Sequence, residues 1–316
     1  MDILVLLKMV PDVVEELQVD AGGKTLDTEF LRLMPNEQDI HALEQALLLK
    51  ERHGAKVTVL ALEALEVDQA LYEALAKGAD RAVRIGPASE QPSTRRAAAQ
   101  FAQAIAGDPA LRSADLILTG TQANDDLDGL LAALVAHELE LPFLGIVVSV
   151  SIDAAGRSAT AVREYAGGVR GEFTVALPAV LGIQAAEKSP RYVPVAKVRA
   201  AMKSSSIGSM AADAASAAIP QIEVLEMAKP AAAGRASMLE GPVDTIAGKV
   251  TEILTERGLL LGGKENVGRV LGCCGAVERT NFTNHSREPG ARQRSGRRAG
   301  DAAGGRTDGS PGLRPG

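Results

Sequence analysis

Short aliphatic runs alternate with amphipathic helical patterns between residues 3 and 142. The runs at residues 3–8, 57–62, 82–85 and 116–119 contain few polar residues, which is typical of strands buried on both faces. Helices are expected between them, from Asn36 to Gly54 and over residues 67–77 and 97–106. Such alternation predicts parallel strands joined by right-handed crossovers. We therefore expect an α/β fold with a doubly wound, mostly parallel sheet and helices on both faces.

The pattern changes after Pro142. Residues 145–152, 159–165 and 172–177 predict consecutive antiparallel strands, separated by Gly156 and by a turn at residues 167–168. An aliphatic run at residues 179–183 follows. We expect one α/β domain over residues 1–200, with these strands as an antiparallel extension. Residues 187–202 are basic and lack strong periodicity, so they are either a solvated loop or a docking site.

The C-terminal third is expected to extend away from this domain. Residues 203–236 are rich in Ser and Ala and predict a linker arm. Apolar residues at helical spacing then predict a helix that stops at Gly258. We expect the arm and helix, over residues 201–262, to pack on a partner subunit. Residues 263–316 turn rich in Gly, Arg, Ser and Pro, which predicts a tail that is disordered or was translated outside the native frame.

Composition narrows the function classes. The 316 residues are 46% hydrophobic and include no Trp, so the core is expected to be aliphatic. A net charge of −6 argues against nucleic acid as a partner. No apolar run approaches the roughly 20 residues of a membrane span, so we expect no membrane insertion and a cytoplasmic location. The adjacent Cys273 and Cys274 fit neither a disulfide framework nor a zinc site.

We find no catalytic constellation and no metal site in the sequence. The four histidines, His41, His53, His137 and His285, are scattered over helical stretches and the tail, so no Ser/His/Asp or Cys/His grouping is indicated. The protein is therefore not expected to be an enzyme.

The stretch from Asp115 to Pro142 is the candidate binding site. A short strand ends at Gly120 and a polar turn leads into a helical pattern, so backbone N–H groups there could bind a phosphate. The alternative is that Asp125, Asp126 and Asp128 only cap the helix. Leu6 and Leu62 also lie at predicted strand ends, where ligands of such sheets bind.

Four sequence motifs resemble one known family. They are the first strand ending in Lys8, Asn36 followed by a helix that ends in Leu49-Lys50-Glu51, the run Ala74-Leu75-Ala76-Lys77-Gly78-Ala79-Asp80-Arg81, and Leu177-Pro178-Ala179-Val180 followed by Pro190-Arg191-Tyr192. In order and spacing, residues 1–262 resemble the beta subunit of electron transfer flavoprotein. The resemblance implies an adenine-nucleotide-binding, HUP-like α/β domain.

The resemblance also implies partners and cofactors. It implies a heterodimer with an alpha subunit that holds the electron-carrying FAD, while this subunit holds AMP, or a second FAD in the electron-bifurcating kind. Donors would be acyl-CoA or other flavin dehydrogenases, and acceptors a quinone oxidoreductase or ferredoxin. By position, Leu6 and Leu62 would bind the nucleotide through the backbone, Asn36 through its amide, and the turn through N–H groups. The implied cofactor-binding residues are Leu6, Asn36, Leu62, Gly120, Gln122, Ala123, Asp125, Asp126, Gly129, Leu130 and Leu131.

The chain departs from the family at the phosphate-binding turn and in the docking segment. The ordinary carriers have Asn-Gln-Thr-Gly where this chain has Gly129, Leu130, Leu131 and Ala132, so three side-chain donors are missing and the nucleotide is left open. Residues 190–196 resemble the loop that docks a dehydrogenase, with Val195 in place of the anchoring leucine. The implied docking residues are Pro190, Arg191, Tyr192 and Val195.

Two other functions compete with this interpretation. The first is a stand-alone adenine-nucleotide-binding module of the same fold, although the segment from Gly120 to Gly129 is poor in glycine for a pyrophosphate loop. The second is a scaffolding subunit that has lost its nucleotide, which Leu130 and Leu131 would suit.

Overall fold

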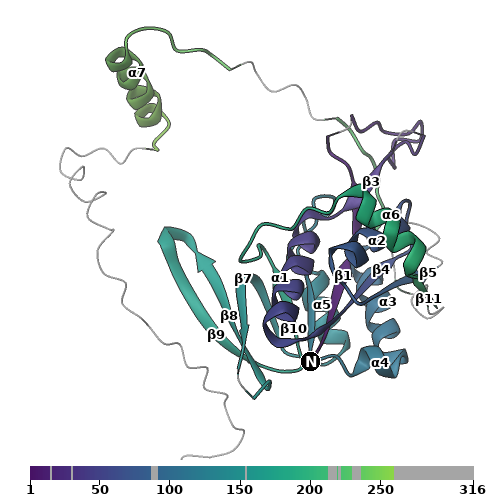
Figure 1. The fold of residues 1–316 in the computed structure, drawn as a ribbon. Coiled ribbons are helices and arrows are strands. Elements are labelled where there is room, and N and C mark those ends of the chain that lie inside the picture. The colour runs from purple at the N-terminus through teal and green to yellow at the C-terminus, as the bar shows by residue number, and fades with distance from the viewer. Residues whose placement is uncertain are drawn as a thin grey trace, which may run out of the picture. The chain divides into compact units, whose positions relative to one another are not determined.

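A nine-stranded sheet forms the centre of the molecule (Figure 1). The computed structural model describes residues 1–14, 16–29, 31–86, 92–153, 155–212, 219, 222–229 and 236–259. The strand order is β11-β5-β4-β1-β6-β10-β7-β8-β9. The parallel strands are β1 (Asp2–Leu7), β4 (Lys56–Leu62), β5 (Arg81–Gly86), β6 (Leu116–Gly120), β10 (Ala179–Ile183) and β11 (Gly208–Ala211).

Helices cover both faces of this sheet, as predicted. One face packs on α1 (Glu37–His53) and α2 (Val67–Lys77), and the other on α3 (Thr94–Gly107), α4 (Pro109–Arg112) and α5 (Leu131–Glu138). Strand β1 contributes side chains to the hydrophobic cores on both faces of the sheet. Ile3, Val5 and Leu7 face one core, and Leu4 and Leu6 face the other. This two-sided burial explains why the strand reads as a continuous aliphatic run.

The direction of chain progression reverses beside β1. The strands that follow it, β4 and β5, are added on one side, and β6 then starts the other side. A reversal of this kind leaves a crevice past the carboxyl ends of the two central strands, because their loops leave in opposite directions. The crevice therefore lies where β1 and β6 end.

The antiparallel extension is also confirmed. Strands β7 (Phe143–Ile152), β8 (Ser158–Tyr165) and β9 (Val169–Ala176) pair antiparallel, with the short 3₁₀ turn η1 (Ala166–Gly168) between the last two. Strand β10 then returns to pair in parallel with both β6 and β7.

A smaller hairpin region lies between β1 and α1. Strand β2 (Met9–Pro11) pairs antiparallel with β3 (Leu33–Pro35), and a bridge joins Val19 to Leu26. The chain thus forms a second, two-stranded sheet before α1 begins.

Two elements differ from the sequence analysis. The sequence predicts no regular structure for residues 187–202, but Val195–Ser204 forms α6, which packs on α2. The helix buries only Val198 and Ala201, so its periodicity was too weak to read. Strand β11 lies within the predicted arm, yet it pairs with β5. It has only four residues, which is too short to show a strand pattern in the sequence.

The predicted C-terminal helix is present as α7 (Val243–Glu256), and none of its residues is buried. No helix in the described part of the chain combines the length and apolar character needed to cross a bilayer. The predictions for residues 263–316 lie outside the described residues.

Gly120 lies where β6 passes directly beneath the first turn of α1. A Cβ atom at this position would be 2.5 Å from Asp39 Oδ1, 2.8 Å from Gln38 Cβ and 2.9 Å from the backbone nitrogen of Asp39. Two of these atoms belong to the helix backbone or to a side chain with no room to move, because Asp39 is only 1% exposed. Only glycine therefore allows α1 to approach β6 this closely.

We expect Gly120→Ala to destabilise the fold by at least about 2 kcal/mol, because the methyl group forces α1 away from the sheet. Urea unfolding of the purified protein measures the loss. Gly107→Ala is the matched control, since a Cβ there meets no atom within 4 Å, and it should be neutral or slightly stabilising. Equal stability of the two variants would show that α1 can retreat from β6 without cost.

Candidate functional site

The crevice at the switch point encloses a cavity of about 620 Å³, a volume in the range of small-molecule sites. Its floor is formed where β1, β4 and β6 end, and its walls come from α1, α3 and the loop before α5. Lining residues on these elements include Leu7, Lys8, Asn36, Asp39, Leu62, Phe101, Gly120 and Leu131. Ile222 and Val224 line it as well, although they lie far along the chain.

The cavity gathers nearly all of the residues that the sequence analysis implied for cofactor binding. Those that line it are Asn36, Leu62, Gly120, Gln122, Ala123, Asp125, Asp126, Gly129, Leu130 and Leu131. Leu6 does not, because its side chain is fully buried in the core between β1 and α3 and the cavity begins at the next residue, Leu7. That these residues bind a ligand stays a prediction.

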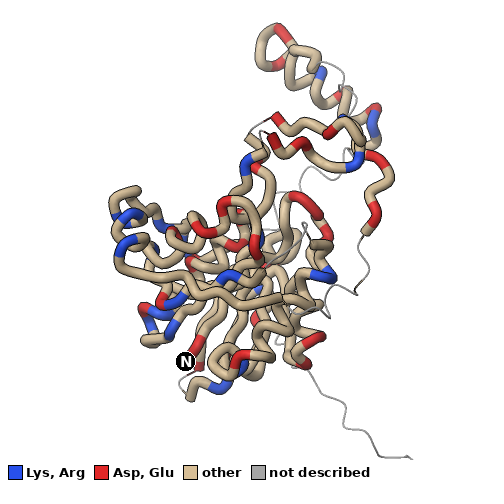
Figure 2. Tube along the Cα trace, turned by 90° about the vertical axis from the view of Figure 1, so that its right-hand side faces the viewer, with Lys and Arg blue, Asp and Glu red and all other residues tan. Residues whose placement is uncertain are grey.

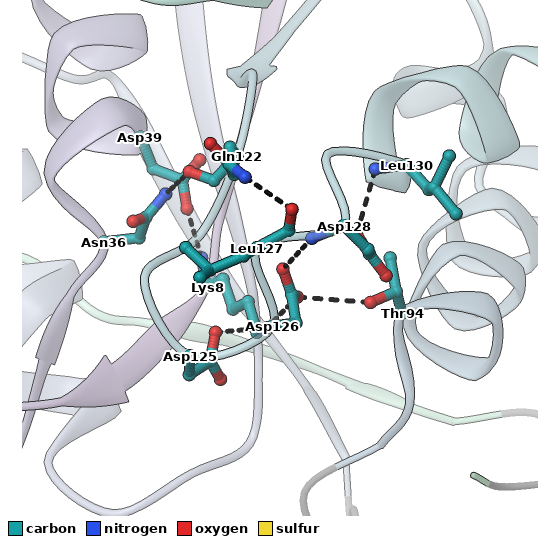
Figure 3. Close-up of polar contacts among 10 residues, drawn as sticks. All are labelled: Lys8, Asn36, Asp39, Thr94, Gln122, Asp125, Asp126, Leu127, Asp128 and Leu130. Atoms are coloured by element: carbon teal, nitrogen blue, oxygen red, sulfur yellow. Dashed lines mark hydrogen bonds and ion pairs between the residues drawn. The ribbon is translucent and has the colours of Figure 1, made fainter. Parts of the chain in front are cut away.

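A buried carboxylate that the sequence analysis passed over organises the floor. Asp39 accepts a hydrogen bond from the N–H of Gly120 at 2.6 Å. It accepts another from the N–H of Lys8 at 2.8 Å (Figure 3). It therefore ties the ends of β6 and β1 to the first turn of α1. Burial raises the pKa of Asp39 to about 6, although the two N–H donors pull in the opposite direction. No sequence signal marked this role, because an acid in the first turn of a helix is ordinary.

The N–H groups of the Gly120 turn are already bonded to protein acceptors. Gly120 donates to Asp39, Thr121 to the carbonyl of Ile183 at 3.0 Å, and Gln122 to Oε1 of Gln38 at 2.8 Å. The Asn36 amide donates to the Gln122 carbonyl at 3.0 Å, so it also supports the turn. The expectation that these N–H groups face a phosphate is therefore wrong for residues 120–122.

Asp125 and Asp126 bind Lys8 rather than cap α5. The Lys8 ammonium lies 2.7 Å from Asp125 Oδ1 and 2.5 Å from Asp126 Oδ2, and the Thr94 hydroxyl donates to Asp126 at 3.2 Å (Figure 3). Burial alone would lower the pKa of Lys8, but the bonds and charges of the two carboxylates outweigh it and raise that pKa. The capping alternative is therefore wrong for these two acids.

Free backbone donors lie instead where α5 begins. Asp128 accepts from the N–H of Leu130 at 3.0 Å, but the N–H groups of Gly129 and Leu131 have no acceptor within the described part of the chain. Both residues line the cavity, and the first N–H groups of a helix have no partner within the helix. This end of the cavity is where an anion would find donors. Lys8 is the one cationic side chain among its described lining residues.

The chain is similar to known proteins over most of its length. The Electron transfer flavoprotein domain matches residues 28–226. The chain belongs to the electron transfer flavoprotein family. The match begins after the lining residues Leu7, Lys8 and Met9 and covers the other lining residues, up to Ile222 and Val224.

Its relatives in this family carry beta-subunit names. The electron transfer flavoprotein subunit beta of Methylophilus methylotrophus is 29% identical over 265 residues, covering 81% of this chain and 98% of that protein. The subunit beta of Mycobacterium tuberculosis (strain ATCC 25618 / H37Rv) is 32% identical over 213 residues, covering 64% and 76%. The protein FixA of Azorhizobium caulinodans is 33% identical over 175 residues, covering 54% and 61%. The resemblance to the beta subunit of electron transfer flavoprotein is thus confirmed.

The segment that resembles the docking loop of this family is fixed to α1. Arg191 donates to both carboxylate oxygens of Glu44 and to Glu51 at 2.7 Å, and its backbone N–H also donates to Glu44. Because Glu44 is only 4% exposed, Arg191 anchors the segment instead of projecting from it. Pro190 is half-buried, while Tyr192 and Val195 are largely exposed. These two are the implied docking residues that the fold leaves accessible.

Asp39 should make stability depend on pH. Its pKa of about 6 in the folded protein lies above the ordinary value of 3.8, so the folded state holds a proton that the unfolded state loses. Stability from this group is complete below pH 4 and falls by about 3 kcal/mol as the pH rises through 6. Asp39→Asn should remove this slope in urea unfolding between pH 4 and 7.5.

Asp115→Asn is the matched control for Asp39→Asn. Asp115 also accepts a backbone N–H, from Asp2, but is 42% exposed. Its replacement should leave the slope unchanged. A constant stability difference between wild type and Asp39→Asn across this range would show that Asp39 titrates normally.

Arg191→Ala should cost about 2 to 4 kcal/mol in thermal or urea unfolding, because it leaves the buried Glu44 carboxylate without its cation. Arg170→Ala removes an exposed pair with Glu164 and should cost less than about 1 kcal/mol. Similar losses in the two variants would mean that Glu44 reaches water once Arg191 is gone.

Proposed function

We propose that this protein is the beta subunit of a heterodimeric electron transfer flavoprotein. In this role it would carry an adenine nucleotide, AMP or a second FAD, in its own cavity. Its partner, an alpha subunit, would hold the FAD that accepts electrons from a flavin dehydrogenase and passes them to a quinone oxidoreductase or ferredoxin. Family membership supports the subunit assignment. The single observation that carries the nucleotide is the cavity at the switch point, with free N–H donors at one end.

The cavity has the features that a nucleotide needs. Apolar side chains such as Leu33, Leu62 and Phe101 line it and would suit the faces of a base. The free N–H groups of Gly129 and Leu131 would donate hydrogen bonds to a phosphate, helped by the positive end of α5. Lys8 already offsets the charges of Asp125 and Asp126, which reduces their repulsion of that phosphate.

This chain would position cofactors rather than make or break bonds. The flavin of the alpha subunit supplies the electron-transfer chemistry when bound. The exposed Tyr192 and Val195, on a segment held rigid by Arg191, would dock the donor dehydrogenase. Helix α7 has an apolar set, including Val243, Val250 and Ile253, that would pack on the alpha subunit.

A second candidate is a scaffolding subunit that has lost its nucleotide. Two observations favour it. The N–H groups of residues 120–122 are used within the protein, and carboxylates outnumber cations among the described residues around the cavity. A stand-alone nucleotide-binding module is the third candidate, and it needs no alpha subunit.

Counting cofactors in the complex purified with its alpha subunit tests the proposal. We expect one FAD plus one AMP for simple carriage, or two FAD for bifurcation, by absorbance and chromatography of the released cofactors. One FAD without a second adenine nucleotide would indicate the scaffolding subunit. Failure to form a yellow complex with any alpha subunit would favour the stand-alone module.

Leu130→Asp should displace the nucleotide, because it puts a negative charge beside the free N–H groups of α5. We expect at least about a tenfold loss of affinity for AMP or FAD, equivalent to 1.4 kcal/mol. Leu130 is 50% exposed, so the fold should tolerate the change. Leu127→Asp is the control, as Leu127 is 65% exposed in the same loop and does not line the cavity. Equal affinity in the two variants would place the phosphate elsewhere.

A further inference from the structure

One wall of the cavity comes from a segment outside the α/β domain. Residues 222–229, here called the cover segment, follow β11 in the chain and contribute Ile222 and Val224 to the cavity lining. These two side chains are two residues apart, whereas Leu225, next to them, does not line the cavity. The cover segment thus turns one apolar row towards the cavity.

The cover segment is fixed to the N-terminal hairpin by a few polar contacts. The N–H of Met227 donates to the carbonyl of Gly23 at 2.7 Å, and Lys229 pairs with Glu16 at 2.7 Å. Glu223 lies 3.9 Å from Lys24. Figure 2 colours these charged residues by sign.

A fourth contact lies upstream of the cover segment, where Arg96 of α3 donates to the carbonyl of Ile219 at 2.7 Å. The ion pairs of the hairpin are exposed, and exposed pairs contribute little and are screened by salt. The cover segment is therefore held in place, but by contacts that break easily.

The apolar residues of this segment have little to pack on within the chain. Ile222 is 75% exposed and Val224 37% exposed, and both line the cavity. Burial of an aliphatic side chain against a flat aromatic ring is favourable, and the faces of a purine supply such a surface. A base in the cavity would give these side chains the partner that the protein does not.

We propose that Ile222 and Val224 are nucleotide-contacting residues, and that the cover segment must lift before the adenine nucleotide can leave. This inference rests on the proposed function, because it needs an adenine nucleotide in the cavity. The contacts of Met227 and Lys229 with the hairpin then set how often the segment lifts, and so set the rate of release.

The double variant Ile222→Ser/Val224→Ser tests the contact. In the complex with the alpha subunit, we measure release of radiolabelled AMP and FAD after dilution into unlabelled nucleotide. Release should be at least about tenfold faster, as expected for the loss of two apolar contacts. Leu225→Ser is the matched control and should release at the wild-type rate, and thermal unfolding checks that both variants fold.

The outcomes separate the two proposals. A wild-type complex that holds no adenine nucleotide besides the FAD of the alpha subunit would overturn the proposed nucleotide binding, and this inference with it. A wild-type complex that binds nucleotide while the double variant releases it at the same rate would overturn only the inference. A wild-type complex that binds nucleotide and a double variant that alone releases it faster would support both.

A charge exchange tests the tie to the hairpin. Glu16→Lys alone places two cations together and should speed release about threefold, the scale of an exposed pair. Adding Lys229→Glu restores opposite charges and should return the rate to that of wild type. If the double variant Glu16→Lys/Lys229→Glu released the nucleotide as fast as Glu16→Lys alone, the role of this pair would be overturned. The exchange keeps the net charge of the wild type but reverses the positions of the two charges, so recovery of the rate depends on the pair itself.

Discussion

The buried carboxylate of Asp39 holds together the elements on which the rest of the structure depends. It accepts N–H groups from the ends of both central strands, at 2.6 Å from Gly120 and 2.8 Å from Lys8. Beyond a strand end such N–H groups have no neighbouring strand to bond, and leaving them buried and unpaired would be costly. One side chain of α1 satisfies both, and the missing side chain of Gly120 lets it come close enough. The floor of the cavity is therefore fixed before any ligand arrives.

Because of this arrangement, backbone N–H groups that could bind an anion lie later in the loop than the end of β6. A strand followed directly by a helix would offer its first N–H groups to a phosphate. Here Asp39, Gln38 and Ile183 use the N–H groups of residues 120–122, and helix α5 starts only at Leu131. The N–H groups of Gly129 and Leu131, at the far end of the loop, are among those with no acceptor in the described part of the chain. Lys8 offsets the charges of Asp125 and Asp126 in this loop. The loop can therefore border an anion although it is acidic.

Elements with a clear local periodicity could be predicted from the sequence. Contacts between residues far apart in the chain could not. The helices α1, α2 and α3 and the aliphatic strands were readable because their patterns are long or strongly apolar. Helix α6 and strand β11 were not, since each shows only a few informative positions. The pairing of Lys8 with Asp126, separated by 118 residues, has no counterpart in any spacing. From the neighbouring sequence alone, Asp126 therefore resembled a helix-capping residue. Asp39 likewise resembled an ordinary acid in the first turn of a helix.

The cavity joins two kinds of contact that differ in how readily they break. Its floor rests on hydrogen bonds of a fully buried carboxylate, whose loss would leave polar groups unpaired in the interior. Its cover rests on one backbone hydrogen bond and on ion pairs exposed to water. A buried ligand needs an exit, and the wall with the lowest cost of opening is the one that opens. If the cavity holds the proposed nucleotide, the difference in burial between Asp39 and Lys229 therefore keeps the floor fixed and makes the cover the part that opens.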